Sequence, residues 1–415
     1  MEPRSAVSPL MPRSPSNLNI GSPSRTSTLA MRKSMAKTIT EPPSKRRKLD
    51  VDLAEQRNEA IGNKYVKGKF LGSGTYATVY EGHLRSDPKF LVAIKKFKFI
   101  TGDGDMDLGL NVDTIREIKY LQELSGHPSL IQMYDIFSTK DQNVSMVLEH
   151  CPNGNLEEFY RSAIPYTNAD IKAWMAMLCR GIYFCHSHFV LHRDIKLNNI
   201  LIANDGSIRI ADFGLARSFA EPGTRMTPNV ITLWYRPLEL LFGAHHYSGA
   251  VDMWSIGCVF AELIGRKPFM IAEVDEKDLD TSAGTLGQIE AICKRIGTPN
   301  EDNWPGVSKL KDWFEPKTQQ PLRDKSHFMK MLPTAGSSAV DFLMALMPLN
   351  PLKRATAKQA LQHSYFTSEP RPTETHKLPR KGGGGIEAMA ASEVQKPGQV
   401  GGEDKYKGVA RKLFN

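Results

Sequence analysis

The sequence predicts an α+β protein with two lobes, a small β-rich lobe followed by a larger, mainly helical one. Its 415 residues exceed the roughly 250–300 residues over which one hydrophobic core usually grows. From Tyr65 onward, apolar and polar residues alternate in runs rich in β-branched and aromatic side chains, which is typical of strands. Between residues 155 and 366 the apolar residues recur with helical spacing instead. We therefore expect one lobe at 65–150 and the other at 151–366.

The small lobe should contain several strands and one helix. Strand patterns run through YVKGKFLGSGTYATVYEGHL, KFLVAIKKFKFI, SLIQMYDIFS and VSMVLEHC, and NVDTIREIKYLQEL has helical spacing. The larger lobe has long helical patterns such as ADIKAWMAMLCRGIYFCHSHF and AVDMWSIGCVFAELI. Strands followed by helices along the chain favour the α+β class.

The two ends differ from the lobes in composition. Residues 1–64 are rich in Ser, Pro, Arg and Lys without an apolar period, and residues 367–415 are mostly polar and contain RKGGGG. We expect a disordered N-terminal tail and a flexible C-terminal one, because neither segment can bury enough apolar surface to offset backbone ordering. A basic cluster in the first tail is read either as a nuclear import address or as a solvated charge run. It consists of Lys45, Arg46, Arg47 and Lys48.

Composition limits the class of protein. The net charge of +9 suits a nucleic acid, an acidic protein, a phosphate-rich ligand, or simply basic tails. The five cysteines include no CxxC pair, so we expect reduced thiols in a cytosolic or nuclear protein. The start of the chain lacks the apolar core of a signal peptide, and no run reaches the roughly 18 apolar residues of a membrane span. We therefore expect no membrane association.

The stretch ILIANDGSIRI predicts a β-hairpin that opens onto a site. If Asp205 and Gly206 form a two-residue turn, Asn199 lies directly opposite Asp212. An amide oxygen and a carboxylate at that open end would suit Mg²⁺ carried by the phosphates of a nucleotide. The alternative is a hairpin whose polar ends have no function.

Two further features point to phosphate binding. Gly72 and Gly74 lie between two strand patterns, where glycine lets backbone N–H groups approach phosphates closely, although a plain tight turn has the same pattern. Lys95 stands among apolar residues on its strand face and needs a partner to stay charged. The best candidate is Glu117, which should point inward from its helix. The competing interpretation, a capping box between Thr114 and Glu117, is less favoured.

Together these motifs resemble the signature set of protein kinases. In order, the set reads Gly72-x-Gly74, Val92-Ala93-Ile94-Lys95, Glu117, His192-Arg193-Asp194, Lys196, Asn199 and Asp212-Phe213-Gly214, within residues 65–366. The resemblance implies the bilobal protein kinase fold, with an antiparallel β-rich N-lobe that carries one regulatory helix and a helical C-lobe. It also implies ATP and Mg²⁺ as cofactors.

The resemblance assigns roles to individual residues. Asp194 should accept or orient the proton of the substrate hydroxyl, with Thr232 bonded near it. Asn199 and Asp212 should hold Mg²⁺, and Lys196 should steady the γ-phosphate, as in serine/threonine kinases. The implied nucleotide site comprises Leu71, Gly72, Ser73, Gly74, Thr75, Tyr76, Ala77, Val79, Ala93, Lys95, Glu117, Glu149, Cys151 and Leu201.

A finer resemblance points to cyclin-dependent kinases. TIREIKYLQEL is similar to their cyclin-binding helix, and DFGLARSF, TLWYR and GTPNEDNWPG also match. ELLFGAHHYSGAVDMWSIGC is most similar to the CDK-activating branch found in transcription factor TFIIH. That branch implies a TFIIH cyclin and a RING-finger assembly subunit as partners, a nuclear location, and Ser/Thr-Pro substrates in the heptad tail of RNA polymerase II or in other cyclin-dependent kinases. We expect no direct nucleic-acid binding, because the tails and a phosphate-binding cleft account for the basic charge.

The same group suggests how the protein is regulated. Thr227 matches the activation-loop phosphosite, and its phosphate should pair with Arg116, Arg193 and Arg217. Arg236 matches an arginine linked with preference for proline after the target residue. We also expect a structural ion pair between Glu239 and Arg354.

Some interpretations stay open. Thr75 and Tyr76 match inhibitory phosphosites of cell-cycle kinases but also suit an ordinary strand turn. The terminal ARKLFN resembles a cyclin-docking peptide, although so short a pattern is common by chance. Leu197 and Pro237-Leu238 depart from the Pro and Ala-Pro of related kinases. Alternatives to an active kinase of the TFIIH branch are a catalytically weak scaffold of a transcription complex and a kinase of the cell-cycle branch.

Overall fold

The structure is a computed structural model that describes residues 43–381, except 75, 99, 102–106, 139–142, 222, 273–280 and 317–318. The chain divides into two compact units, Met1–Arg57 and Asn58–Asn415. Both predicted lobes belong to the second unit. No described helix combines the length and the apolar character that a lipid bilayer requires. The terminal ARKLFN lies outside the described residues.

Part of the predicted N-terminal tail is helical. Helix α2 (Pro43–Asn63) occupies it, so the prediction of disorder over 1–64 is wrong for this stretch. The stretch is rich in Lys, Arg, Leu, Ala, Glu and Gln, which are good helix formers. Its apolar residues do not collect on one face, so an argument from periodicity missed the helix. In the last turns, the Asn58 side chain donates to Ser138 O and accepts from Ser138 N, both at 2.7 Å.

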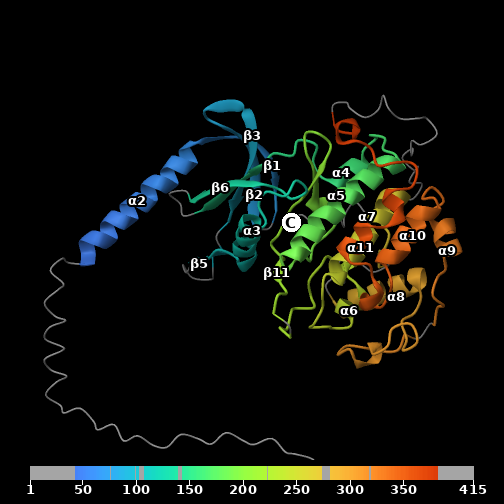
Figure 1. Ribbon diagram of the computed structural model, residues 1–415. Helices are drawn as coiled ribbons and strands as arrows, with labels where there is room; N and C mark the ends of the chain where they lie inside the picture. Colours follow the sequence, from blue (N-terminus) through green and yellow to red (C-terminus); the bar gives the residue numbers. More distant parts are fainter. Residues whose placement is uncertain are drawn as a thin grey trace, which may run out of the picture. The chain divides into compact units, whose positions relative to one another are not determined.

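The small lobe is built on a five-stranded antiparallel sheet in the order β1-β2-β3-β7-β6, which confirms the predicted β-rich lobe (Figure 1). Tyr65, Val92, Ile94 and Val147 form a small core in it. The five strands are β1 (Tyr65–Ser73), β2 (Ala77–Leu84), β3 (Asp87–Phe97), β6 (Met133–Ser138) and β7 (Val144–Glu149). A two-stranded ribbon follows β3, formed by β4 (Ile100–Thr101) and β5 (Asp107–Gly109).

The predicted helix of this lobe is α3 (Val112–Glu123), which lies beside the sheet in Figure 1. The side chain of Asn111 caps its first turn by accepting from the backbone N–H of Asp113. The less favoured alternative, a capping box between Thr114 and Glu117, is wrong, because the helix begins earlier and Glu117 lies in its interior. Glu117 is buried, whereas Val112 and Ile115 are more than half exposed.

The larger lobe is mainly helical, as predicted. Helices α5 and α7 run through its core, and Trp174 and Trp254 are almost fully buried there. The helices are α4 (Leu156–Arg161), α5 (Asn168–Ser187), α6 (Leu238–Leu241), α7 (Ala250–Gly265), α8 (Ser282–Ile296), α9 (Lys325–Met331), α10 (Ser337–Leu346) and α11 (Ala357–Leu361). Two short ribbons pair β8 (Val190–Leu191) with β11 (Arg217–Ser218) and β9 (Ile200–Ile202) with β10 (Ile208–Ile210).

Residues 367–381 pack on the helical lobe, so the prediction of a flexible tail over 367–415 is wrong for its first part. Lys172 of α5 donates to Ser368 O at 2.9 Å and to Pro370 O at 2.7 Å. Leu378 is fully buried, and the backbone N–H of Lys381 donates to Asn153 Oδ1 at 2.8 Å. Specific polar contacts to distant residues order this segment, and composition does not report such contacts.

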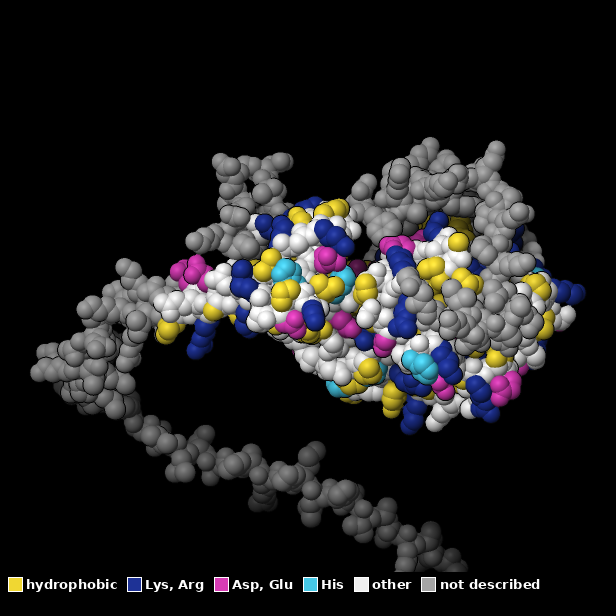
Figure 2. Space-filling view, turned by 90° about the horizontal axis from the view of Figure 1, so that it is seen from above, with side chains coloured by type: hydrophobic (Ala, Val, Ile, Leu, Met, Phe, Trp, Pro, Cys, Tyr) yellow, Lys and Arg dark blue, Asp and Glu magenta, His cyan; other side chains and the backbone are white. Residues whose placement is uncertain are grey.

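Cysteines and surface charge agree with a reduced, mixed-charge protein. All five cysteines are unpaired, and Cys151 is the one that is not fully buried. On the face in Figure 2, Lys and Arg side chains lie among acidic, apolar and uncharged polar ones. The net charge of +9 is therefore not collected into one basic patch on the described part of this face.

A buried carboxylate on α7 makes stability depend on pH. Glu262 is 3% exposed. Its oxygens accept from the Tyr235 hydroxyl at 2.7 Å and from the Phe269 N–H at 3.2 Å. Burial nevertheless raises the pKa of Glu262 to about 7, from an ordinary value of 4.5. Between these two values the folded state keeps a proton that the unfolded state loses, so stability falls as the pH rises.

Replacing Glu262 with Gln should flatten this part of the pH profile. In the wild type, the free energy of unfolding should fall by at most about 1.4 kcal/mol per pH unit between pH 4.5 and 7. Urea unfolding at several pH values in that window measures the slope. The exposed Glu290→Gln is the matched control and should keep the wild-type slope. An unchanged slope in Glu262→Gln would show that this carboxyl does not titrate there.

Candidate active site

A cavity of about 330 Å³ is lined by residues of both lobes. Most of the predicted chemistry-bearing residues meet in it, although they come from segments far apart in the chain. From the small lobe the lining comprises Gly74, Tyr76, Ala77, Val79, Lys95, Phe97, Asp113, Thr114 and Glu117, and from the larger lobe Lys196, Asn198, Asn199, Asp212 and Gly214.

The predicted ion pair between β3 and α3 is confirmed. Lys95 Nζ lies 2.7 Å from each carboxylate oxygen of Glu117, and both side chains are largely buried. Burial alone would lower the pKa of Lys95, but Glu117 and Asp212 outweigh it and raise that pKa. Lys95 therefore stays a cation beside the cavity.

Asp194 is held from three sides. Its Oδ1 accepts from the Thr232 hydroxyl at 2.9 Å, which confirms the predicted bond, and its Oδ2 lies 2.9 Å from Lys196 Nζ. Asn199 Nδ2 donates both to Asp194 Oδ2 and to the Asp194 carbonyl, each at 2.8 Å. Burial would raise the pKa of Asp194, but Lys196, His192 and the Thr232 hydroxyl lower it overall. The residue is therefore an oriented carboxylate at neutral pH.

The hairpin of β9 and β10 has a different register from the predicted one. Ile200 pairs with Ile210, and the Ala211 N–H donates to Asn199 O at 2.9 Å, so Asn199 faces Ala211 and not Asp212. The turn is longer than two residues, because the Ala203 N–H donates to Ser207 O. Such turns commonly end in a left-handed residue, and Gly206 has a φ of 83°.

Asn199 and Asp212 nevertheless line the same cavity. Asp212 has a φ of 64°, which ends the strand alternation that would have turned its side chain away. Both amide hydrogens of Asn199 are used on Asp194, so the atom left to bind a cation is its oxygen. No three His, Cys, Asp or Glu side chains of the described part of the chain cluster into a metal site. An amide oxygen and a carboxylate fit Mg²⁺ that receives its other ligands from phosphates and water.

Only some of the predicted nucleotide-binding residues line this cavity. The Gly74 N–H donates to Ala77 O at 2.8 Å, which closes a tight turn between β1 and β2. Thr75 lies outside the described residues. The carboxylate of Glu149 accepts from Arg209 Nε at 2.9 and 3.0 Å. Predicted residues that do not line the cavity are Leu71, Gly72 and Ser73 on β1, Ala93 on β3, Glu149 and Cys151 at and after the end of β7, and Leu201 on β9.

Asp252 of α7 supports the site and was missed in the sequence. It is fully buried and accepts from the backbone N–H groups of His192 at 3.0 Å and Arg193 at 2.9 Å. His186 Nε2 lies 2.8 Å from Oδ2, the oxygen that also accepts from His192. The two backbone bonds fix the chain just before Asp194. The available signal was a carboxylate inside the apolar run AVDMWSIGCVF, which cannot be buried without partners.

The predicted regulatory residues are only partly close together. The Tyr247 hydroxyl accepts from Arg193 Nη1 at 2.9 Å and donates to Thr227 O at 2.8 Å. Burial raises the pKa of Tyr247, and the charge of Arg217 acts in the opposite direction. Arg116 instead donates to Asp113 on its own helix at 2.8 Å.

Arg236 binds the backbone of the segment that follows Thr227. Its Nε donates to Val230 O at 2.9 Å, and its Nη2 donates to Ile231 O at 2.9 Å. Ile231 has a φ of 69°, a left-handed conformation that is uncommon for a β-branched residue.

Two further sequence observations concern structural residues. The predicted pair of Glu239 and Arg354 is confirmed as a buried two-pronged ion pair, with Arg354 Nη2 2.7 Å from Glu239 Oε2. Leu197, which departs from the related pattern, is buried in the core.

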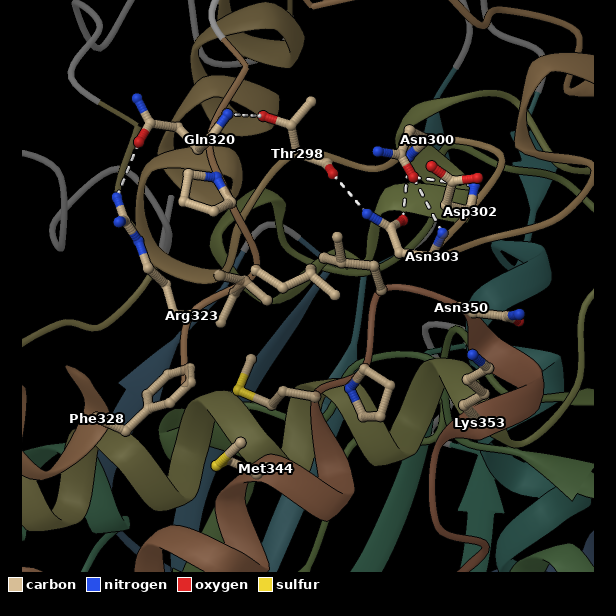
Figure 3. A pocket seen from close by; sticks show the side chains of 16 residues that line it. Thr298, Asn300, Asp302, Asn303, Gln320, Arg323, Phe328, Met344, Asn350 and Lys353 are labelled. Atoms are coloured by element: carbon tan, nitrogen blue, oxygen red, sulfur yellow. Dashed lines mark hydrogen bonds between the residues drawn. The ribbon is translucent and has the colours of Figure 1, made fainter. Parts of the chain in front are cut away.

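A second cavity, of about 560 Å³, lies in the helical lobe (Figure 3). Its polar side chains mostly bond to the loops around it. Asn303 Nδ2 donates to Thr298 O at 2.8 Å, and Arg323 Nη2 donates to Gln320 Oε1 at 3.0 Å. Asp302 is the one carboxylate in its lining, so this cavity offers no paired groups for acid–base chemistry.

Comparison with known proteins supports a kinase active site at the first cavity. The family model described as "Protein kinase domain" matches residues 65–366. The serine/threonine-protein kinase KIN28 of Saccharomyces cerevisiae is 40% identical, with 76% of this chain and 97% of that protein covered. Cyclin-dependent kinase 7 of Xenopus laevis is 40% identical, with 76% and 85% covered.

A solved structure extends the likeness to the fold. The CAK complex from Chaetomium thermophilum bound to ATP-gamma-S contains a chain that is 52% identical, with a TM-score of 0.73. The match covers 79% of this chain and 98% of that one. On the family match, the identities and the fold, this chain belongs to the protein kinase family, within its cyclin-dependent serine/threonine kinases.

Proposed function

We propose that this kinase transfers the γ-phosphate of ATP to Ser/Thr-Pro sites, with the heptad tail of RNA polymerase II as its main substrate. The supporting observation is that Lys95, Glu117, Asn199 and Asp212 line one cavity, with the ion pair formed, and that Asp194 is oriented by Thr232 and bonded to Asn199. A scaffold would not need this complete set, which argues against the catalytically weak alternative. Other cyclin-dependent kinases, through their activation loops, are further proposed substrates.

The protein groups would bind and neutralise the nucleotide. Lys95, kept charged by Glu117, would bind the α- and β-phosphates under the glycine-containing turn at Gly74. Mg²⁺, when bound with ATP between Asn199 and Asp212, would neutralise the charge that develops on the phosphates. Glu149 and Cys151 would offer backbone groups to adenine.

Asp194 would handle the proton of the substrate hydroxyl. Its low pKa keeps it ionised and able to accept a hydrogen bond from the incoming hydroxyl. Thr232 and Lys196 hold its two oxygens, and Lys196 would also reach the γ-phosphate. Orientation and charge do most of the work in such a transfer, since the chemistry needs little covalent help.

A preference for proline follows from the backbone at Ile231. The carbonyl of Ile231 accepts from Arg236, so it is engaged and not open to an N–H of the residue after the target. Proline has no backbone N–H, so it loses no hydrogen bond at this position. Any other residue would leave its backbone N–H without an acceptor.

Arg236→Ala should weaken this preference. The ratio of kcat/KM for a Ser-Pro peptide to that for a Ser-Ala peptide should fall about 5- to 10-fold, because one backbone hydrogen bond becomes available to the second peptide. Steady-state assays on the two peptides measure the ratio. Arg371→Ala, which removes an exposed arginine of the helical lobe, should leave it unchanged. Equal ratios in wild type and Arg236→Ala would exclude this source of specificity.

A cyclin and a RING-finger assembly subunit are the proposed partners, on the basis of exposed apolar residues on α3 and of the likeness to a solved complex. The exposed Val112 and Ile115 lie on α3, and a TFIIH-like cyclin bound there would hold Glu117 against Lys95. The likeness to a chain of a CAK complex supports this cyclin and a RING-finger assembly subunit. A nuclear location fits the resemblance to the TFIIH branch and the basic cluster at 45–48 in the first turns of α2.

Thr227 is proposed as an activating phosphosite. A phosphate there would lie near Arg193 and Arg217. Arg193 and the carbonyl of Thr227 both bond to the Tyr247 hydroxyl, and the charge of Arg217 acts on the pKa of Tyr247. Arg116 would have to leave Asp113 to join them. Such charge-assisted bonds can order an activation segment.

The decisive experiment is co-purification of the kinase from its host, followed by an assay on a Ser-Pro heptad peptide. We expect a cyclin and a RING-finger protein in the purified complex, and turnover that stops when Mg²⁺ is chelated. A heptad peptide with Ala in place of each target Ser is the control. Absence of turnover by the intact complex on any Ser-Pro peptide would contradict the proposal, and a cell-cycle cyclin in the complex would favour the other branch.

A further inference from the structure

Tyr247 connects two segments on which the proposed reaction depends. It lies between α6 and α7 and packs partly against the main hydrophobic core. Its hydroxyl accepts from Arg193 Nη1 at 2.9 Å and donates to the carbonyl of Thr227 at 2.8 Å. One hydroxyl therefore joins the residue directly before Asp194 to the backbone of the activation segment.

The other bonds of Arg193 make this connection rigid on the catalytic side. Its backbone N–H donates to Asp252 Oδ1 at 2.9 Å, and its Nε donates to Leu215 O at 2.7 Å. With a φ of 63°, its backbone is also held in an uncommon conformation. A displacement of the guanidinium is thus transmitted to the backbone beside Asp194.

On the other side of Tyr247, the segment that carries Thr227 is held by fewer hydrogen bonds. Thr227 is bound to Tyr247 through its carbonyl, and the nearby Arg217 donates from Nη2 to Arg225 O at 3.1 Å. Burial raises the pKa of Tyr247, although Arg193 and Arg217 act in the opposite direction. The hydroxyl therefore keeps the proton that it donates to Thr227.

We propose that Tyr247 is a positioning residue that transmits the placement of Thr227 to Asp194 through Arg193. This inference rests on the proposed phosphoryl transfer and on Thr227 as its phosphosite. Tyr247 touches no reacting atom, and its contribution is confined to the hydroxyl, which phenylalanine lacks. The structure thereby assigns a role in activity to a residue outside the cavity lining.

The test compares Tyr247→Phe, Thr227→Ala and the double variant in the intact complex purified from its host. Rates are expressed per nucleotide-binding site and, for the variants that keep Thr227, at equal phosphate content on that residue. Tyr247→Phe should lower kcat by about 5- to 20-fold, the loss expected from one or two hydrogen bonds, with the KM for ATP nearly unchanged. The double variant should be no slower than Thr227→Ala, because Thr227→Ala keeps the carbonyl but removes the phosphate whose placement of this segment the Tyr247 bond would transmit.

Tyr183→Phe, a half-exposed tyrosine on α5, is the matched control and should behave as wild type. A wild-type kcat in Tyr247→Phe, or losses that multiply in the double variant, would overturn the inference. Hydrogen exchange of the backbone around residue 227 gives a readout that needs no activity, and it should speed up in Tyr247→Phe. If the wild-type complex has no activity, the proposed function fails, while unchanged exchange in Tyr247→Phe would still refute the connection.

Discussion

Replacing Asp194 with Asn is expected to lower kcat on a Ser-Pro peptide by about 10²- to 10⁴-fold, the range typical for a lost general base. Asparagine keeps the shape of the side chain but cannot accept the hydroxyl proton. It also removes the negative charge that Lys196 contacts at 2.9 Å. The KM for ATP should change little, because the nucleotide-binding groups at Lys95 and Asp212 are untouched. Steady-state kinetics with varied peptide and varied ATP separate the two effects.

The hairpin turn offers a matched control. Asp205→Asn makes the same chemical change at a residue whose carboxylate accepts from the Ser207 N–H at 3.0 Å, outside the cavity lining. Its kcat should equal that of the wild type. Wild-type turnover by Asp194→Asn would remove the residue from the reaction and revive the scaffold alternative.

Replacing Arg354 with Met is expected to lower the free energy of unfolding by about 3–5 kcal/mol, the usual cost of removing one partner of a buried ion pair. Arg354 and Glu239 are almost completely buried. Without the guanidinium, the carboxylate of Glu239 is left buried and uncompensated. The backbone carbonyls of Pro348 and Leu349 also lose their donors. Urea unfolding followed by fluorescence measures the change.

A double variant separates the energy of the ion pair itself from the cost of leaving one buried charge without a partner. Removing both charges, with Arg354→Met and Glu239→Leu together, should recover much of the stability, since a buried pair replaced by apolar residues is often neutral. Arg371→Met interrupts the exposed pair with Glu369 and should cost less than about 1 kcal/mol. A loss of similar size in Arg354→Met and Arg371→Met would contradict the importance of burial.

The candidate site was largely predictable because each of its motifs is local. A strand with Lys95 among apolar residues, a helix that turns Glu117 inward, and a polar stretch ending in Asn199 are all readable within about a dozen residues. Requiring a partner for the half-buried Lys95 was a sound physical argument, and it correctly preferred the ion pair to the capping box. The family resemblance then fixed the roles that spacing alone left open.

The errors arose where distant or fine contacts decide the structure. The predicted register of the hairpin was wrong by one residue, because the turn contains three residues and not two. Asn199 and Asp212 still line the same cavity, because Asp212 has a left-handed backbone conformation. Helix α2 formed through propensity without an apolar face. The segment up to Lys381 became ordered through Lys172 and Asn153, more than two hundred positions away in the second case.

The amino-acid sequence alone determined the lobes, the catalytic groups and the order in which they occur, because periodicity and local chemistry are properties of short stretches. Tertiary structure decided which of those groups lie close together and how Asp252 and Tyr247 support them. It also decided how far the ordered C-terminal segment extends, since Lys381 bonds to Asn153. The physical reason is that burial and hydrogen-bond satisfaction depend on what packs against a residue, and for these residues the partners are distant in the chain.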